Sequence, residues 1–135
     1  MQDMLHIVMW VALGSAIGGP ARYFVSGLVG RRVGETFPWG TMVVNISGAF
    51  SIGVAAGAAT IEGLLPMPAG WQLIVTGFLG AYTTVSSFSL QTMALARDGQ
   101  VLKAGGNVAL SLSSCLSAVA LGYGVAMLLW GASQP

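Results

Sequence analysis

The chain has 135 residues, of which 55% are hydrophobic and only 7% are charged. Soluble globular domains average about 25% charged residues, so this composition excludes an ordinary water-facing surface and predicts an integral membrane protein. The net charge of +1 comes without a basic patch, which argues against nucleic-acid binding, and the low polarity excludes a disordered chain.

Four apolar segments follow one another along the chain, each long enough to cross a membrane. They run over about residues 5–29, 39–60, 71–96 and 101–130. Charges and prolines cluster in the breaks between them, as hydropathy logic requires. We therefore predict an all-α integral membrane fold, with residues 1–135 forming a single domain of four transmembrane helices.

Small residues mark the first two segments. Gly14 and Gly18 are four positions apart, as are Gly53 and Gly57. Membrane helices pack through small residues at this spacing because their backbones can approach closely. We expect close helix contacts at both pairs.

The third segment contains a stretch that is poorly suited to a continuous helix. Residues 77–84 hold two glycines and a pair of threonines, residue types that weaken a helix. A break there would free backbone carbonyls at membrane depth, where something must satisfy them. A cation is one candidate, and a neighbouring hydroxyl is the other.

No Asp, Glu or His lies in the middle of any segment. A proton-coupled exporter usually needs a titratable group inside the membrane, and a metal transporter would need carboxylate, His or Cys ligands. Cys115 is the only cysteine. The serines have no buried base to activate them, so we do not expect an enzyme.

Neutral hydrogen-bond donors are the polar groups that remain inside the segments. Hydroxyls and amide groups can donate to an anion, and aromatic ring edges are weakly positive. A narrow path lined with them would replace the water lost by a small anion without trapping it. The alternative is that the hydroxyls bond to carbonyls of their own helices.

Three motifs resemble those of the Fluc (CrcB) family of fluoride channels. They are GGPARY at residues 18–23, GTMVVNISG at 40–48 and GFLGAYTTVSSFS at 77–89. The second and third are long and specific, and the length and four-segment layout also match. The resemblance implies an antiparallel, dual-topology dimer with a broken third helix and two fluoride pathways.

The resemblance also assigns roles to positions. It implies a structural Na⁺ held by the backbone carbonyls of Gly80 and Thr83, and a structural role for Arg22. It places the fluoride pathway on polar and aromatic residues of the second, third and fourth segments: Thr41, Asn45, Ser86, Ser87, Phe88, Ser89, Asn107, Ser111 and Cys115.

Two positions depart from the family pattern. The first phenylalanine of the third motif is Val85 here, so only Phe88 supplies a ring edge. Gln91 stands where the family often has Glu. We expect reduced conduction, or an altered pore, compared with a family member that has both phenylalanines.

Basic residues are distributed unevenly about the four segments. The first and third connections carry Arg31, Arg32, Arg97 and Lys103, whereas the other end carries none. The Lys/Arg bias predicts that these connections are cytoplasmic. A dual-topology protein should show little bias, so the chain either forms an antiparallel homodimer regardless or pairs with an oppositely oriented homologue as a heterodimer.

These observations favour a passive fluoride channel in the bacterial inner (plasma) membrane that exports cytoplasmic fluoride and gives fluoride resistance. Its expected partners are the fluoride ion, the lipid bilayer and a second subunit. The alternatives are a small proton-coupled drug-type exporter, which lacks its carboxylate here, and a non-transporting membrane assembly subunit.

Overall fold

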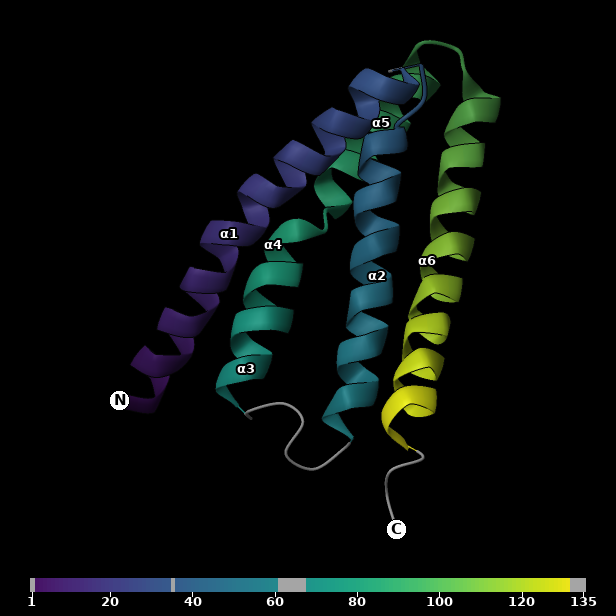
Figure 1. Cartoon of the computed structure of the whole chain (residues 1–135). Coiled ribbons are helices and arrows are strands. Elements are labelled where there is room, and N and C mark those ends of the chain that lie inside the picture. Colours follow the sequence, from purple (N-terminus) through teal and green to yellow (C-terminus); the bar gives the residue numbers. More distant parts are fainter. Residues whose placement is uncertain (1, 35, 61–67, 132–135) are drawn as a thin grey trace.

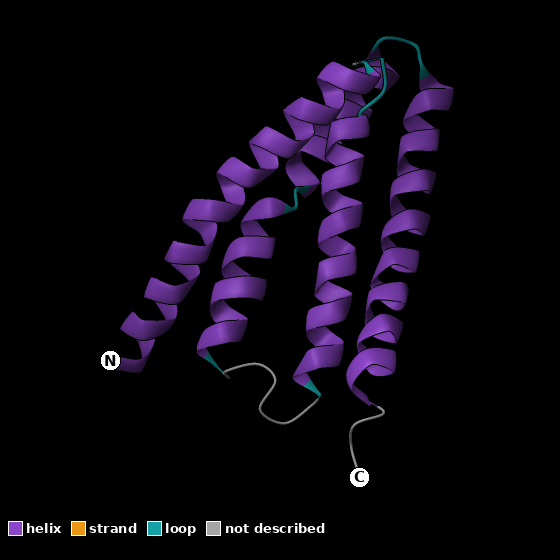
Figure 2. Ribbon diagram, viewed as in Figure 1, coloured by secondary structure: helices purple, strands orange, loops and turns teal. Residues whose placement is uncertain are grey.

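A computed structural model describes residues 2–34, 36–60 and 68–131. Its helices are α1 (Gln2–Val33), α2 (Trp39–Ala59), α3 (Ala69–Trp71), the π-helix η1 (Gln72–Leu79), α4 (Gly80–Tyr82), α5 (Val85–Arg97) and α6 (Val101–Trp130). Figure 1 shows α2 and α6 side by side, with α1 slanting away from them. The described residues contain no strand (Figure 2).

Four helical stretches are long and apolar enough to cross a membrane. They are Asp3–Val33, Trp39–Ala59, Ala69–Arg97 and Val101–Trp130. The prediction of an all-α membrane protein with four spans is therefore confirmed. The third stretch is assembled from α3, η1, α4 and α5.

The third span changes conformation near its middle. Helix α4 ends at Tyr82 and α5 begins at Val85. Between them, Thr83 (φ −76°, ψ 160°) and Thr84 (φ −152°, ψ 120°) have extended backbone. We call these two residues the Thr83–Thr84 link; it is the short loop between α4 and α5 in Figure 2.

Glycines set the distance between packed helices. A Cβ atom at Gly122 of α6 would overlap the Phe50 carbonyl oxygen of α2, and one at Gly53 of α2 would overlap the Val119 carbonyl oxygen of α6. On α1, a Cβ at Gly14 or Gly18 would strike the backbone of η1. Backbones in such close contact gain dispersion energy that lipid cannot replace.

Most large apolar side chains point outward. Leu102, Leu128 and Tyr23 are each more than 80% exposed in the single chain, whereas Val44 is fully buried. Soluble monomers do not expose apolar surface on this scale. The outer surface therefore needs lipid or another subunit against it.

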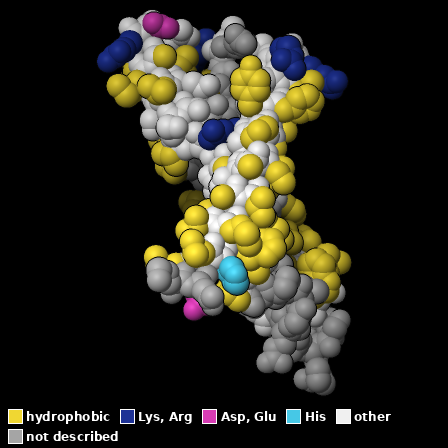
Figure 3. Space-filling model, turned by 90° about the vertical axis from the view of Figure 1, so that its left-hand side faces the viewer, with side chains coloured by type: hydrophobic (Ala, Val, Ile, Leu, Met, Phe, Trp, Pro, Cys, Tyr) yellow, Lys and Arg dark blue, Asp and Glu magenta, His cyan; other side chains and the backbone are white. Residues whose placement is uncertain are grey.

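Charge gathers at one end of the molecule. Arg31 and Arg32 close α1, Arg97 closes α5 and Lys103 lies in the first turn of α6. Figure 3 shows the Lys and Arg side chains at the end that carries these connections, with one further basic side chain between the two ends. Arg22 is the fifth basic residue.

We predict that Gly122→Ala lowers the free energy of unfolding by about 1–3 kcal/mol, because the new methyl group must displace the Phe50 carbonyl. Thermal unfolding in detergent, followed by circular dichroism, measures the loss. Gly124→Ala is the control, since nothing lies within 4 Å of a Cβ at that position. Equal losses in the two variants would contradict close α2–α6 packing.

Candidate functional site

Asn45 of α2 joins the Thr83–Thr84 link through both ends of its side-chain amide. Its Nδ2 donates to the Thr84 carbonyl oxygen at 2.9 Å, and its Oδ1 accepts from the Thr84 backbone N–H at 2.8 Å. One side chain thus satisfies both backbone groups of a buried residue. Unpaired backbone groups are costly at membrane depth, so this amide stabilises the extended link.

The Thr84 side chain also caps α5. Its Oγ1 accepts from the Ser87 backbone N–H at 3.2 Å. The same oxygen lies 3.1 Å from Ser86 Oγ and donates to Ser87 Oγ at 3.2 Å. Capping by a threonine oxygen satisfies a helix N–H that has no partner within the helix. The link therefore ends in a cluster of three hydroxyl groups.

Helix α1 contacts the third span through two side-chain donors. Arg22 Nη1 donates to the Thr83 carbonyl oxygen at 3.4 Å, and Ser15 Oγ donates to the Gly77 carbonyl oxygen at 3.3 Å. Both bonds are long. On the other side, Ser47 of α2 and the Tyr82 hydroxyl are 3.0 Å apart. Arg22 thus lies beside the link, and the structural role that the family resemblance implies for it stays a prediction.

Two cavities meet at Thr84. The inner cavity, of about 340 Å³, lies among α2, α5 and α6, and it is lined by Asn45, Ala49, Ile52, Thr83, Thr84, Val85, Phe88, Ser111, Leu112, Cys115 and Val119. The Arg22 cavity, of about 230 Å³, lies beside α1 and is lined by Arg22, Tyr23, Ser26, Thr41, Thr84 and Ser87.

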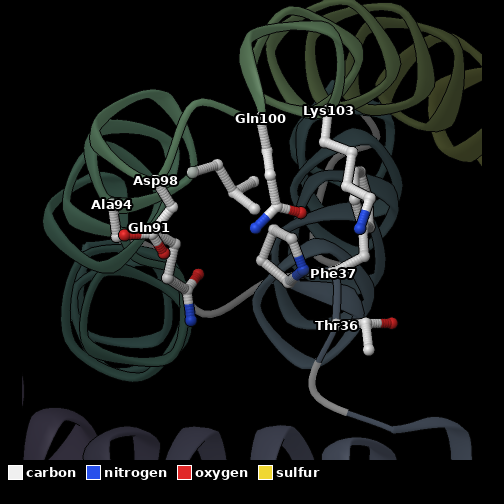
Figure 4. A pocket seen from close by; sticks show the side chains of 9 residues that line it. Thr36, Phe37, Gln91, Ala94, Asp98, Gln100 and Lys103 are labelled. Atoms are coloured by element: carbon white, nitrogen blue, oxygen red, sulfur yellow. The ribbon is translucent and has the colours of Figure 1, made fainter.

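Two further cavities continue toward the basic end. The middle cavity, of about 430 Å³, shares Ser26, Thr41 and Ser87 with the Arg22 cavity. It shares Phe37, Pro38 and Gln91 with the mouth cavity, of about 500 Å³, which also touches Lys103. Figure 4 shows Gln100 and Lys103 extending toward Phe37 in the mouth cavity. Neighbouring cavities thus share walls from the basic end to the link.

Gln91 stands between the mouth and middle cavities. Its Oε1 is the one buried side-chain oxygen or nitrogen without a hydrogen-bond partner in residues 2–34, 36–60 and 68–131. A buried acceptor without a donor is costly. The neutral amide at this position therefore has an acceptor that a hydrogen-bond donor entering either cavity could satisfy.

The polar residues of α6 divide between two roles. Asn107 is almost fully buried, and its Nδ2 donates to Thr92 Oγ1 of α5 at 2.8 Å. Asn107 lines none of the four cavities and instead joins α5 to α6. Ser111 and Cys115 line the inner cavity, and Ser111 Oγ reaches Asn107 Oδ1 only at 3.5 Å.

The pathway residues expected from the sequence are therefore only partly brought together. Thr41, Asn45, Ser87, Phe88, Ser111 and Cys115 line the cavities around Thr84. Ser86 and Ser89 are exposed and line none of the four. Val85 lines the inner cavity and is 76% exposed.

Three residues that join the helices at or near the site were not identified from the sequence. They are Ser15, Tyr82 and Thr92, each of which bonds a different helix. A polar residue within an apolar segment was their signal, but many such residues only bond their own helix. Ser113, for example, donates to the Ala109 carbonyl oxygen at 2.8 Å.

Comparison with known proteins identifies related chains. Residues 9–123 match the family model described as CrcB-like protein, Camphor Resistance (CrcB). The chain is 58% identical over 130 residues to fluoride-specific ion channel FluC 2 of Rhodopseudomonas palustris, covering 96% of this chain and 99% of that one. It is 55% identical over 121 residues to FluC 2 of Bradyrhizobium diazoefficiens, covering 89% and 88%.

We predict that Thr92→Val lowers the free energy of unfolding by about 1–3 kcal/mol, because it leaves the buried Asn107 amide without its acceptor. Chemical or thermal unfolding in detergent measures the change. Ser113→Ala removes an exposed hydroxyl that bonds only its own helix, and it should be nearly neutral. A Thr92→Val protein as stable as Ser113→Ala would show that the α5–α6 bond contributes nothing.

Proposed function

This chain belongs to the CrcB family, and from that premise we propose that it is a passive, fluoride-selective channel that lets fluoride leave the cytoplasm. Its relatives carry the name fluoride-specific ion channel. Fluoride enters cells as the uncharged weak acid and is trapped inside as the anion, which membrane potential can drive out through an open path.

The observation that carries this proposal is the pair of cavities that meet at Thr84. Their walls present neutral donors from several helices, among them Thr41, Asn45 and Ser111. Fluoride is small and strongly hydrated, so a pathway must supply donors in place of water. No carboxylate lines either of these two cavities, whereas Asp98 lines the mouth cavity together with Lys103.

Fluoride would approach from the basic end. Four of the five Lys and Arg residues lie there, and a basic surface raises the local concentration of anions. The mouth and middle cavities then lead past Gln91 to Thr41 and Ser87. The same charge bias supports a cytoplasmic location for this end, in a bacterial inner membrane.

Within the inner cavity, Phe88 is the one aromatic residue in the lining. Phe88 borders the inner cavity, and its ring edge would offer weakly positive hydrogens to an anion. Val85 borders the same cavity with an aliphatic side chain that has no such edge. Its exposure supports our proposal that a second subunit completes the pathway at this wall.

We propose an antiparallel, dual-topology homodimer, because the apolar outer surface and the exposed Val85 and Gly80 need a covering. The strong charge bias favours one orientation for each chain. A heterodimer with an oppositely oriented homologue is therefore the alternative, and purified protein that conducts fluoride without a partner would exclude it.

We propose that the Thr83–Thr84 link and the end of α4 hold a structural sodium ion. Thr83 ends α4 with extended backbone, and its carbonyl oxygen receives only the long bond from Arg22. The Thr84 N–H, which would bond the Gly80 carbonyl in a continuous helix, donates to Asn45 instead. Carbonyl oxygens suit a hard cation, and the carbonyls of Gly80 and Thr83 would hold it. The bound cation would supply a partner for these two carbonyls and make the link more rigid.

Fluoride efflux from proteoliposomes tests the function. We predict efflux for the unmodified chain, none with chloride, and a loss of about tenfold or more in Phe88→Ala, because the remaining ring edge disappears. A fluoride electrode measures the rate. Leu128→Ala, at an exposed site that borders no described cavity, is the control. A chain that passes chloride as fast as fluoride, or no fluoride, would refute the proposal.

We predict that Val85→Phe raises fluoride efflux several-fold, because it restores an electropositive ring edge at the inner cavity. Stopped-flow or electrode efflux at matched protein density measures the gain. Val8→Phe is the control, because it adds the same ring at another exposed valine, on α1, that lines none of the described cavities. Efflux that Val85→Phe leaves unchanged would argue that the valine does not limit conduction.

A further inference from the structure

The Asn45 amide replaces a hydrogen bond of the third span. In a continuous α-helix, the N–H of residue 84 would donate to the carbonyl of residue 80. Here the Thr84 N–H donates to Asn45 Oδ1 at 2.8 Å. The Gly80 carbonyl has thereby lost its helical donor.

The same Asn45 side chain also keeps α4 from continuing as a helix through Thr84. Asn45 Nδ2 donates to the Thr84 carbonyl oxygen at 2.9 Å. Both backbone groups of Thr84 therefore bond a side chain of α2 and not another turn of the third span. Thr84 is buried and has φ −152° and ψ 120°, a strand-like conformation that suits such sideways bonds. A primary amide is needed, because it carries a donor and an acceptor on one planar group.

The effect extends to the neighbouring carbonyl. Thr83 has ψ 160°, and its N–H and Oγ1 both bond the Leu79 carbonyl oxygen at 3.0 Å. Its own carbonyl is left with Arg22 Nη1 at 3.4 Å as its donor. The Thr83 carbonyl therefore has one long hydrogen bond, and the Gly80 carbonyl has lost its helical donor. Gly80 is exposed in the single chain.

We propose that Asn45 is the positioning residue of the cation site: by binding Thr84, it keeps the Gly80 and Thr83 carbonyls available to a sodium ion. This inference rests on the sodium site of the proposed function. Both polar atoms of the Asn45 amide bond Thr84, so Asn45 would act through Thr84 and not as a ligand of the cation. Its role is to keep Gly80 from regaining its helical hydrogen bond.

Ser47 offers a matched comparison on the same helix. Ser47 Oγ and the Tyr82 hydroxyl are 3.0 Å apart, so this pair also ties α2 to the segment beside the link. It involves no backbone group of Gly80, Thr83 or Thr84. Loss of the Ser47 hydroxyl should weaken the tie without changing which carbonyls are free.

The test compares thermal unfolding in NaCl and in choline chloride at equal ionic strength, after purification without sodium. A cation that binds only the folded state raises Tm, and the rise grows with the logarithm of the cation concentration once this exceeds Kd. We expect sodium to raise Tm for the unmodified chain and for Ser47→Ala, although Ser47→Ala unfolds at a lower temperature in both salts. For Asn45→Ala we expect the sodium-dependent rise to disappear.

A sodium-dependent rise that survives in Asn45→Ala would overturn the inference, because Asn45 would then only stabilise the fold. If Asn45→Ala does not fold, Asn45→Ser carries the same comparison, since its short side chain cannot reach both groups of Thr84. Absence of any sodium effect in the unmodified chain would also overturn it. Fluoride efflux of the unmodified chain and of Ser47→Ala tests the proposed function separately, because neither preparation alters a residue of the proposed pathway.

Discussion

The pairing of one asparagine amide with both backbone groups of Thr84 is the interaction on which the rest of this structure depends. Hydrocarbon offers no water to an unpaired N–H or carbonyl, so an extended segment at membrane depth needs partners from the protein. Asn45 supplies both partners from a neighbouring helix. The third span can therefore leave the helical path at Thr83 and Thr84 without leaving Thr84 unsatisfied.

That departure creates the geometry around it. Where the helix ends, Thr84 becomes the first capping residue of α5 and gathers the hydroxyls of Ser86 and Ser87. The cavities on either side share Thr84 as a wall. The extended link thus supports the hydroxyl cluster and borders two cavities, which would serve the proposed passage of fluoride.

The remaining stability comes from contacts that lipid cannot imitate. Lipid tails are as apolar as leucine, so helices gain little from burying leucine and more from close backbone contact. Gly53 and Gly122 allow this contact between α2 and α6, and Gly14 and Gly18 allow it between α1 and η1. Small residues therefore occupy the inside while large apolar residues face outward.

The sequence by itself determined the four apolar spans, the family and the absence of acids within the spans, because these follow from composition, periodicity and contiguous motifs. It also located the weak helical stretch at 77–84. Only the tertiary structure decided what each polar side chain of the spans bonds or faces. Thr41 and Ser87 face cavities, Asn107 ties α5 to α6 away from them, and Ser89 lies exposed. Those outcomes depend on which helix stands opposite each side chain, and the local pattern of residues carries no record of that.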